Sequence, residues 1–510
     1  MAGLFEIGAQ FPHEDHIERL AKYKRLRKVY EGKAYEVYER AVKIIKDSPQ
    51  AEQLDKLHIA CNIVDPIVKK PADMLVGERP TFDTSRPSEE VVSQRLADIV
   101  EKNNIEQLVH ELVIGGGYRG DSWIKVRYGY SEDYSELEAL GLPVPTDAEM
   151  RPIIEHVDAM TVFPETVEGN IKQFKAINIA QLEIVEKKKT ILGTVEEVYL
   201  NVERHLPGYI IYERYRLEDK SVDTTYGVPI STFYIVEKVP TGRENDIVET
   251  GVPFPLVFHI PYTSLDDTWQ GECTLEKLES LIAALHDRIA QIDYILWKHS
   301  DPQMYGPAIG SDESTRVGGR YIEVEKDDVV PGYMTWNSQL DGAFKQLDKI
   351  LGMIFQIAET PDWLFGTSII GDGNKAGGTS HTTNAAIKSR YLPIISKVQR
   401  IRLHVDKAIR DALYAAQLLE NYANRDNKNF VTYEPVRPTI VWKDGIPSDL
   451  KELAEIASIR TGGKPTLDVK TAIRRMDDVD GIEADRIIRN IAEDEARERG
   501  FVDAETLREG

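Results

Sequence analysis

The stretch TLEKLESLIAALHDRIAQIDYILWKH, residues 274–299, decides the fold together with SQLDGAFKQLDKILGMIFQIAE, residues 338–359. In both stretches apolar residues recur at alternating spacings of three and four, which keeps one helix face against a partner over several turns. The repeated positions are Leu275, Leu278, Ile282, Leu285, Ile289, Ile292 and Leu296 in the first stretch, and Leu340, Phe344, Leu347, Leu351 and Ile354 in the second. The sequence therefore predicts two long packed helices, which would extend roughly 40 Å and 30 Å.

The segments that follow each of these helices are rich in glycine. Residues 301–337 contain several Gly and Pro residues and predict a compact insert with short strands at 320–325 and 329–334. A glycine-rich loop at 366–378 precedes a third helical pattern over 382–422, in which Pro393 should kink the helix rather than end it. The expected order is helix, insert, helix, loop and helix.

The remainder of the chain predicts helices and strands in separate blocks. Helical spacing covers 14–46, 51–74 and 89–114, and the three glycines at 115–117 should end the last of these helices. Alternating patterns rich in β-branched and aromatic residues then predict antiparallel strands at 123–128, 153–162, 174–185, 195–202, 209–217 and 232–239. The tail predicts a strand at 439–442 and helices at 449–459, 468–475 and 483–499. The fold class is α+β, mainly helical.

Composition excludes several classes of protein. The chain has 63 Lys and Arg against 85 Asp and Glu, a net charge of −22, which argues against a protein that reads DNA by neutralising phosphates. The same charge suits a passage along which DNA slides without sticking. Two cysteines, Cys61 and Cys273, predict neither a disulfide framework nor a zinc cluster, and indicate a reducing compartment. No apolar run is long enough for a membrane span, and residues 1–10 do not resemble a secretory signal.

Motifs for catalysis are incomplete. Gly366 and Gly371 have the spacing of the two glycines in a phosphate-binding loop. The next residue is Asp372, where that loop needs a lysine. Residues 371–376, GDGNKA, match the dinucleotide fingerprint, yet they lie between two helices rather than directly after a strand. His13 and His16 are one residue too close for the zinc-protease motif. The sequence therefore predicts no catalytic residue, no metal site and no cofactor, and indicates a structural or mechanical protein.

Several short segments, in this order along the chain, carry a family resemblance. They are NIVDP at 62–66, LVGERP at 75–80, FPLVF at 254–258, TPD at 360–362 and IVWKD at 440–444. With the helix, insert and loop pattern between them, the chain resembles the portal proteins of tailed bacteriophages over about residues 62–499. These proteins form dodecameric rings at one vertex of the capsid.

The resemblance implies a portal-type subunit that forms a ring around a central channel. Residues 1–272 correspond to the wing, with a helical N-terminus and antiparallel strands. Residues 273–300 and 338–360 correspond to two stem helices, and 301–337 to the clip between them. The expected tunnel loop, long kinked wing helix and crown are residues 361–383, 384–423 and 424–510.

The resemblance also assigns candidate site residues. In the tunnel loop, small and flexible residues with one cation should make weak, sequence-independent contacts to DNA phosphate: Gly371, Gly373, Asn374, Lys375, Gly377, Gly378, Thr379 and Ser380. The aromatic run Trp363 to Phe365 is expected to pack at the base of that loop. Stem packing is expected at Leu278, Ile282, Leu285, Ile289, Ile292, Leu296, Phe344, Leu347 and Leu351, and clip docking at Asp312, Arg316 and Arg320.

The implied function is a portal vertex protein that conducts double-stranded DNA into the capsid during packaging and out during ejection. Its partners would be further copies of itself (a dodecamer), the DNA, the terminase large subunit, the head–tail adaptor, and the major capsid and scaffolding proteins, with no membrane. It would be assembled in the host cytoplasm and located in the virion. Two alternatives stay open: a cytoplasmic enzyme that binds a nucleotide with residues 366–378, and a scaffold whose helices form an ordinary coiled coil.

Overall fold

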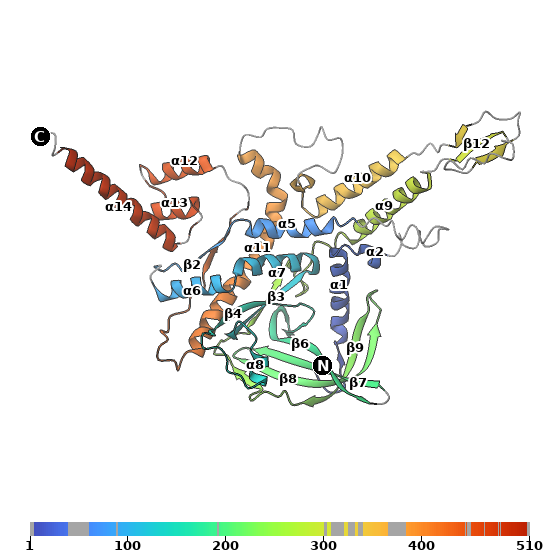
Figure 1. The fold of residues 1–510 in the computed structure, drawn as a ribbon, viewed down its shortest axis with the longest axis horizontal. Helices are drawn as coiled ribbons and strands as arrows, with labels where there is room; N and C mark the ends of the chain where they lie inside the picture. Colours follow the sequence, from blue (N-terminus) through green and yellow to red (C-terminus); the bar gives the residue numbers. More distant parts are fainter. Residues whose placement is uncertain are drawn as a thin grey trace. The chain divides into compact units, whose positions relative to one another are not determined.

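The computed structural model describes residues 5–38, 61–87, 90–190, 193–299, 303–307, 321–324, 332–334, 340–365, 384–443, 445, 450–463, 465–477, 479 and 481–506 (Figure 1). The chain divides into two compact units. The first comprises Met1–Tyr23, Val68–Cys273 and Ser380–Gly510, and the second comprises Lys24–Ile67 and Thr274–Thr379. Among the helices in these ranges, none is long and apolar enough to cross a bilayer.

A seven-stranded antiparallel sheet dominates the first unit, as the alternating patterns predict. Its strands follow the order β1-β9-β8-β7-β6-β5, and β10 pairs with β8. The bounds are β1 Gln10–Phe11, β5 Val162–Val167, β6 Asn170–Thr190, β7 Gly193–Leu206, β8 Tyr209–Asp223, β9 Ile230–Val239 and β10 Ile247–Glu249. One face carries the apolar residues of the alternation and packs against Ile17, Leu20 and Ala21 of helix α1 (Glu14–Tyr30). Burial of this face fixes the register of the strands, because a slip by one residue would expose it.

A second sheet of three strands, β11-β3-β4, completes the core of this unit. Its strands are β3 Asp121–Tyr130, β4 Met150–Val157 and β11 Val257–Pro261. The predicted strand at 153–162 is therefore two strands, β4 and β5, because the chain turns at 158–161. The long helix α11 (Asn384–Ala423) packs against all three strands and runs without interruption through Pro393.

Two helix predictions are wrong in detail. The pattern at 89–114 forms two helices, α6 (Val91–Lys102) and α7 (Ile105–Arg119), because Asn104 adopts a left-handed conformation between them. The glycines at 115–117 lie inside α7 rather than ending it. A Cβ on Gly117 would lie 2.9 Å from Val68 Cγ1 in α5 (Val64–Val76), so close packing between helices explains this glycine. The helix ends instead at Gly120, whose φ is +98°.

The predicted helix at 14–46 is also interrupted. Helix α1 ends at Tyr30, and Gly32, with φ of +81°, makes the turn into the short helix α2 (Ala34–Val37). The N–H of Lys33 bonds to the carbonyl of Lys28 at 2.9 Å, and so the last turn of α1 is closed. Residues 39–60 lie outside the described part of the chain.

A buried polar cluster joins α1 to the three-stranded sheet in the first unit. The carboxylate of Asp121 is 0 % exposed and accepts hydrogen bonds from the Tyr23 hydroxyl, from His259 Nε2 at 2.6 Å and from the Gly271 amide at 2.7 Å. Arg19 is also buried and donates to the carbonyls of Ala159 and Val162 at 3.1 and 2.9 Å. Both buried charges thus have hydrogen-bond partners, as burial requires, although Nε of Arg19 itself makes no hydrogen bond.

The last part of the chain returns to this unit. Strand β15 (Thr439–Val441) pairs with β2 (Thr81–Asp83), and three helices follow, α12 (Leu450–Thr461), α13 (Val469–Met476) and α14 (Gly481–Thr506). The Asp468 side chain caps α13 by accepting from the Thr471 amide at 2.8 Å. The predicted tail of one strand and three helices is confirmed.

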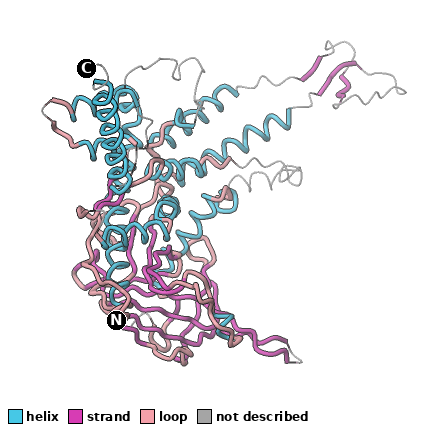
Figure 2. The backbone as a smooth tube through the Cα atoms, turned by 60° about the vertical axis from the view of Figure 1, so that its left-hand side comes forward, coloured by secondary structure: helices cyan, strands magenta, loops and turns pink. Residues whose placement is uncertain are grey.

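The second unit contains the helices predicted from residues 274–299 and 338–359. They are α9 (Glu279–His299) and α10 (Leu340–Ile357), which lie side by side in Figures 1 and 2. Residues 274–278 form turns before α9 rather than its first turn. Leu275 and Leu278 are nevertheless fully buried. They fit the apolar repeat because they pack in the core, although they do not belong to the helix.

The insert between α9 and α10 contains a small sheet of order β13-β12-β14. Strands β13 (Tyr321–Val324) and β14 (Gly332–Met334) lie within the predicted segments, whereas β12 (Gln303–Pro307) was not predicted. Strand β12 pairs in parallel with β13 and antiparallel with β14. It carries Gly306 and Pro307, residues that usually argue against a central strand.

Candidate functional site

The predicted stem residues lie along α9 and α10, with Leu278 just before α9, and their burial changes along the helices. Ile282 and Leu285, near the start of α9, and Leu351, near the end of α10, are buried. At the opposite ends, next to the insert, Leu296 is 49 % exposed and Phe344 is 44 % exposed. Ile292 is buried, and Ile289 and Leu347 are half-buried. Within one chain, the described residues thus cover only part of the repeated apolar face.

The predicted clip residues Asp312, Arg316 and Arg320 lie outside the described ranges. The described part of this insert consists of the three short strands β12, β13 and β14. Their role in docking stays a prediction.

The predicted tunnel-loop residues, Gly371 to Ser380, also lie outside the described ranges. Residues 359–365, on the N-terminal side of the loop, lie within the described ranges. Helix α10 ends where Glu359 takes a φ of +53°, and the amide of Thr360 bonds to the carbonyl of Phe355 at 3.1 Å. A 3-10 turn at Asp362–Phe365 follows, and the rings of Phe365 and Phe355 lie 5.7 Å apart. Trp363, Leu364 and Phe365 are half-buried.

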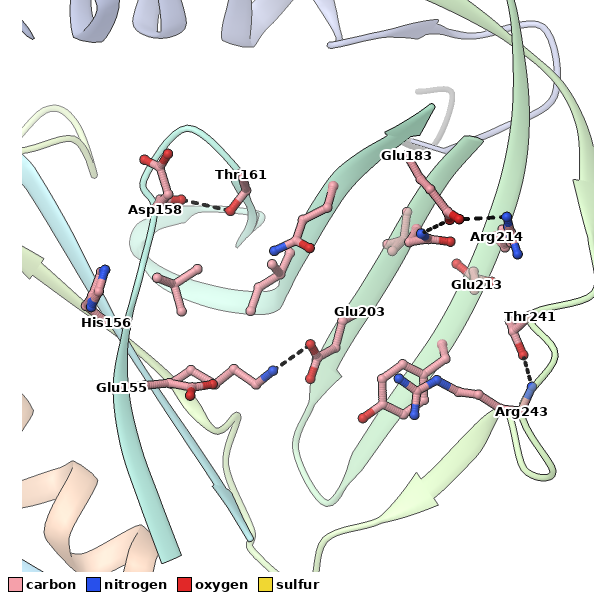
Figure 3. Close-up of a pocket in the computed structure, with 17 residues that line it drawn as sticks. Glu155, His156, Asp158, Thr161, Glu183, Glu203, Glu213, Arg214, Thr241 and Arg243 are labelled. Atoms are coloured by element: carbon pink, nitrogen blue, oxygen red, sulfur yellow. Dashed lines mark hydrogen bonds and ion pairs between the residues drawn. The ribbon is translucent and has the colours of Figure 1, made fainter. Parts of the chain in front are cut away.

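A polar pocket of about 530 Å³ lies beside the two sheets of the first unit (Figure 3). We call it the sheet pocket. It is lined by charged side chains from β3, β4, β6, β7 and β8 that pair with one another. Lys125 Nζ lies 2.7 Å from Glu203 Oε2, and Glu183 accepts from Arg214 at 3.1 Å and from Asn201 at 2.7 Å. The guanidinium of Arg243 stacks over the Tyr212 ring.

The electrostatics of this sheet pocket favour stable ion pairs over proton transfer. Burial alone would raise the pKa of Glu203, but the His205 hydrogen bond and the positive charge of Lys125 lower it to about 2. A general acid or base works best with a pKa near the working pH, so Glu203 does not fit that role. Within the described ranges, no three His, Cys, Asp or Glu side chains are grouped so that they could bind a metal.

The sequence did not reveal the sheet pocket or the Asp121 cluster. Their members come from strands far apart in the chain, and each alone is an ordinary charged residue of an alternating pattern. The available signal was a charged or histidine residue at an inward position of a strand. Such a residue predicts a buried pair but does not identify its partner.

Comparison with protein families matches residues 11–498 to the family described as phage portal protein, SPP1 Gp6-like. No curated protein matches the chain. The match covers nearly the whole chain, including α9, the insert, α10 and the helices of the tail. The family is structural rather than catalytic, and nothing favours the nucleotide-binding alternative. The chain therefore belongs to the phage portal protein family and is a portal vertex protein, the head–tail connector of a tailed phage.

Proposed function

We propose that twelve copies of the chain form a closed ring in which α9 and α10 act as the stem around a DNA channel. The observation that carries this proposal is the gradient of burial along the two helices. Leu296 and Phe344 continue the apolar repeat but stay about half exposed in one subunit. Exposed apolar residues in such a repeat favour packing against another helix. In a ring, the stem helices of neighbouring subunits supply that partner.

The other segments take the roles that family membership implies. Residues 1–272 with 384–423 act as the wing, 301–337 as the clip and 424–510 as the crown. The clip, with Asp312, Arg316 and Arg320, docks the terminase large subunit and later the head–tail adaptor. The wing and crown contact the major capsid and scaffolding proteins. The division into compact units supports treating 274–379 as one functional block, although residues 24–67 belong to the same unit.

Residues 361–383 act as the tunnel loop and contact the moving DNA. Gly371, Gly373, Gly377 and Gly378 provide backbone amides, and Lys375 provides one cation. Such groups contact phosphate without reading sequence. The net charge of −22 on each copy limits non-specific retention of DNA.

Replacing the four glycines Gly371, Gly373, Gly377 and Gly378 by alanine tests the role of the loop. We expect rings to assemble normally while packaging of DNA in a reconstituted motor assay falls, because alanine restricts the backbone conformations open to the loop. Gly342→Ala in α10 is the matched control, since a Cβ there would meet no atom within 4 Å. Failure of ring assembly in the loop variant would show that the loop is a structural element and not a channel element.

A further inference from the structure

An aromatic pocket of about 610 Å³ lies in the first unit where β11, the start of β6 and helix α11 meet. Half-buried rings from separate segments line it: Phe174 of β6, Phe258 of β11 and Trp269 of the loop after β11. The rings of Phe174 and Trp269 lie 6.1 Å apart in an edge-to-face arrangement. Half-buried aromatic rings around a hollow are typical of protein-binding surfaces.

The aromatic pocket is positively charged in an acidic protein. Lys172, Lys407 and Arg437 line it against a single carboxylate, Asp411, so its formal charge is 3 − 1 = +2. Arg437 pairs with Asp411 at 3.0 Å. Lys172 donates to neutral oxygens, among them Ser264 Oγ at 2.9 Å, and Lys407 is exposed. The positive field also affects His404, whose pKa is lowered first by burial and then by His259, Lys172 and Lys407.

A complementary surface lies on the same chain. Residues 131–149, which join β3 to β4 and include the short helix α8 (Ser135–Ala139), contain six Asp or Glu residues and no Lys or Arg. We call this segment the acidic hairpin loop. Leu140 and Leu142 within it are 72 % and 50 % exposed. Glu149 pairs with Lys102 at 2.7 Å, whereas Glu132 and Glu136 extend the acidic surface and are exposed.

The aromatic pocket and the acidic hairpin loop lie toward opposite ends of strand β3. This strand is the central one of the three-stranded sheet, whose order is β11-β3-β4. The aromatic pocket includes Val257 and Pro261 of edge strand β11, which pair with Lys125 and Asp121 in the first half of β3. The acidic hairpin loop follows Tyr130 at the other end of β3 and leads into the opposite edge strand. A strand rises about 3.3 Å per residue, so the loop begins roughly 20 Å from the pocket of its own subunit.

We propose that the acidic hairpin loop of one subunit docks in the aromatic pocket of its neighbour. Its exposed leucines would lie among the rings, and its carboxylates would pair with the exposed Lys407 in the positive field to which Lys172 contributes. Two different, complementary surfaces at opposite ends of one sheet produce a head-to-tail contact, which is the kind of contact that closes a ring. This inference rests on the ring of the proposed function and adds an interface to it.

Charge exchange tests the pairing in the full-length protein. Lys407→Glu and Glu136→Lys should each weaken subunit association, measured by mass photometry across a dilution series, by about tenfold, since each replaces attraction with repulsion. The double variant should return to within about threefold of the original affinity. Lys428→Glu and Glu244→Lys, on other exposed loops, are matched controls that should leave association unchanged.

Disulfide trapping tests the geometry independently. In a Cys61→Ser background, the pair Leu140→Cys and Phe258→Cys should give covalently linked subunits on oxidation, because the two positions would touch across the interface. The control pair keeps Leu140→Cys and places the second cysteine at Tyr226, which is 40 % exposed and does not line the aromatic pocket. It should give no linked species.

Three outcomes separate the two proposals. Weakening by single reversals, recovery in the double variant and crosslinking support the interface. Intact rings with no crosslink and no effect of either reversal overturn the interface but leave the portal ring standing. Absence of rings in the unaltered protein overturns the proposed ring together with this interface.

Discussion

Removing the carboxylate of Asp121 should destabilise the first unit more than removing any exposed charged group would. The side chain is 0 % exposed and accepts three hydrogen bonds, from Tyr23, His259 and the backbone of Gly271. These donors come from α1, from β11 and from Gly271 in the segment after β11, so one carboxylate holds three segments together. In Asp121→Ala, all three donors would lose their acceptor in a site closed to water.

The magnitude follows from those contacts. Breaking a buried, hydrogen-bonded charge pair by removing one partner costs about 3–5 kcal/mol. Tyr23→Phe removes a single hydrogen bond to a charged group and should cost about 1.5–3 kcal/mol. Burial alone would raise the pKa of Asp121, but the bonds and charge of His259, with those of Tyr23 and Gly271, lower it below 3.8. This stabilisation is therefore present above pH 3.8 and is lost as the pH falls through the lowered value.

Thermal unfolding followed by tryptophan fluorescence measures the effect. Trp123 is a local reporter, since it is 0 % exposed and its ring lies 4.4 Å from that of His259. We expect Asp121→Ala to lower Tm by about 6 °C or more, with a smaller fall for Tyr23→Phe. The control Asp426→Ala, at a side chain that is 91 % exposed, should stay within about 1 °C. An unchanged Tm in Asp121→Ala would refute the structural role of the cluster.

Three further predictions address other parts of the structure. Burial and Arg19 lower the pKa of His16 from 6.5 to about 3, so the free energy of unfolding should fall by up to about 1.4 kcal/mol per pH unit as the pH drops from 6.5 to about 3. In His16→Gln, Tm should depend less on pH in that range. An unaltered profile of Tm against pH would show that His16 is not the source of this pH dependence. Gly120→Ala should lower Tm far more than Gly208→Ala, because a Cβ at Gly120 would lie 2.2 Å from Gly271 O. A Cβ at Gly208 would meet no atom within 4 Å, so that variant carries only a backbone strain of about 1–2 kcal/mol. Equal effects of the two substitutions on Tm would contradict the close approach of Gly120 to Gly271. Leu296→Ala, at a half-exposed position, should leave Tm nearly unchanged but weaken ring assembly. Leu285→Ala, at a fully buried position, should lower the free energy of unfolding by about 2–5 kcal/mol. Normal ring assembly of Leu296→Ala would argue against stem packing at that position.

Long periodic segments were predictable because periodicity reports a single continuous face. The helix now seen over Asn384–Ala423 and the strands of the large sheet follow their apolar spacing closely. The errors occur where a tertiary contact overrides a local preference. The three glycines at 115–117 predict a helix end, yet they lie inside α7, and at Gly117 the close approach of Val68 explains why the residue is glycine. Leu275 and Leu278 fit the helical repeat but are buried in turns.

The site was less predictable than the fold. Family membership implied which segments form the channel, but residues 371–380 and Asp312 to Arg320 lie outside the described ranges, so their roles stay predictions. The sheet pocket and the aromatic pocket depend on pairing between strands far apart in sequence. Lys172 and Lys407, for example, lie 235 positions apart in the sequence and line one hollow. Spacing along a sequence carries no information about such a juxtaposition until the sheet order is known.

Electron microscopy of the purified, full-length protein tests the central claim most directly. The account predicts closed rings of twelve subunits with a central channel wide enough for double-stranded DNA. It also predicts that α9 and α10 of neighbouring subunits pack together around that channel, with Leu296 and Phe344 covered. A monomer or dimer, or an open filament with these residues exposed, would contradict it.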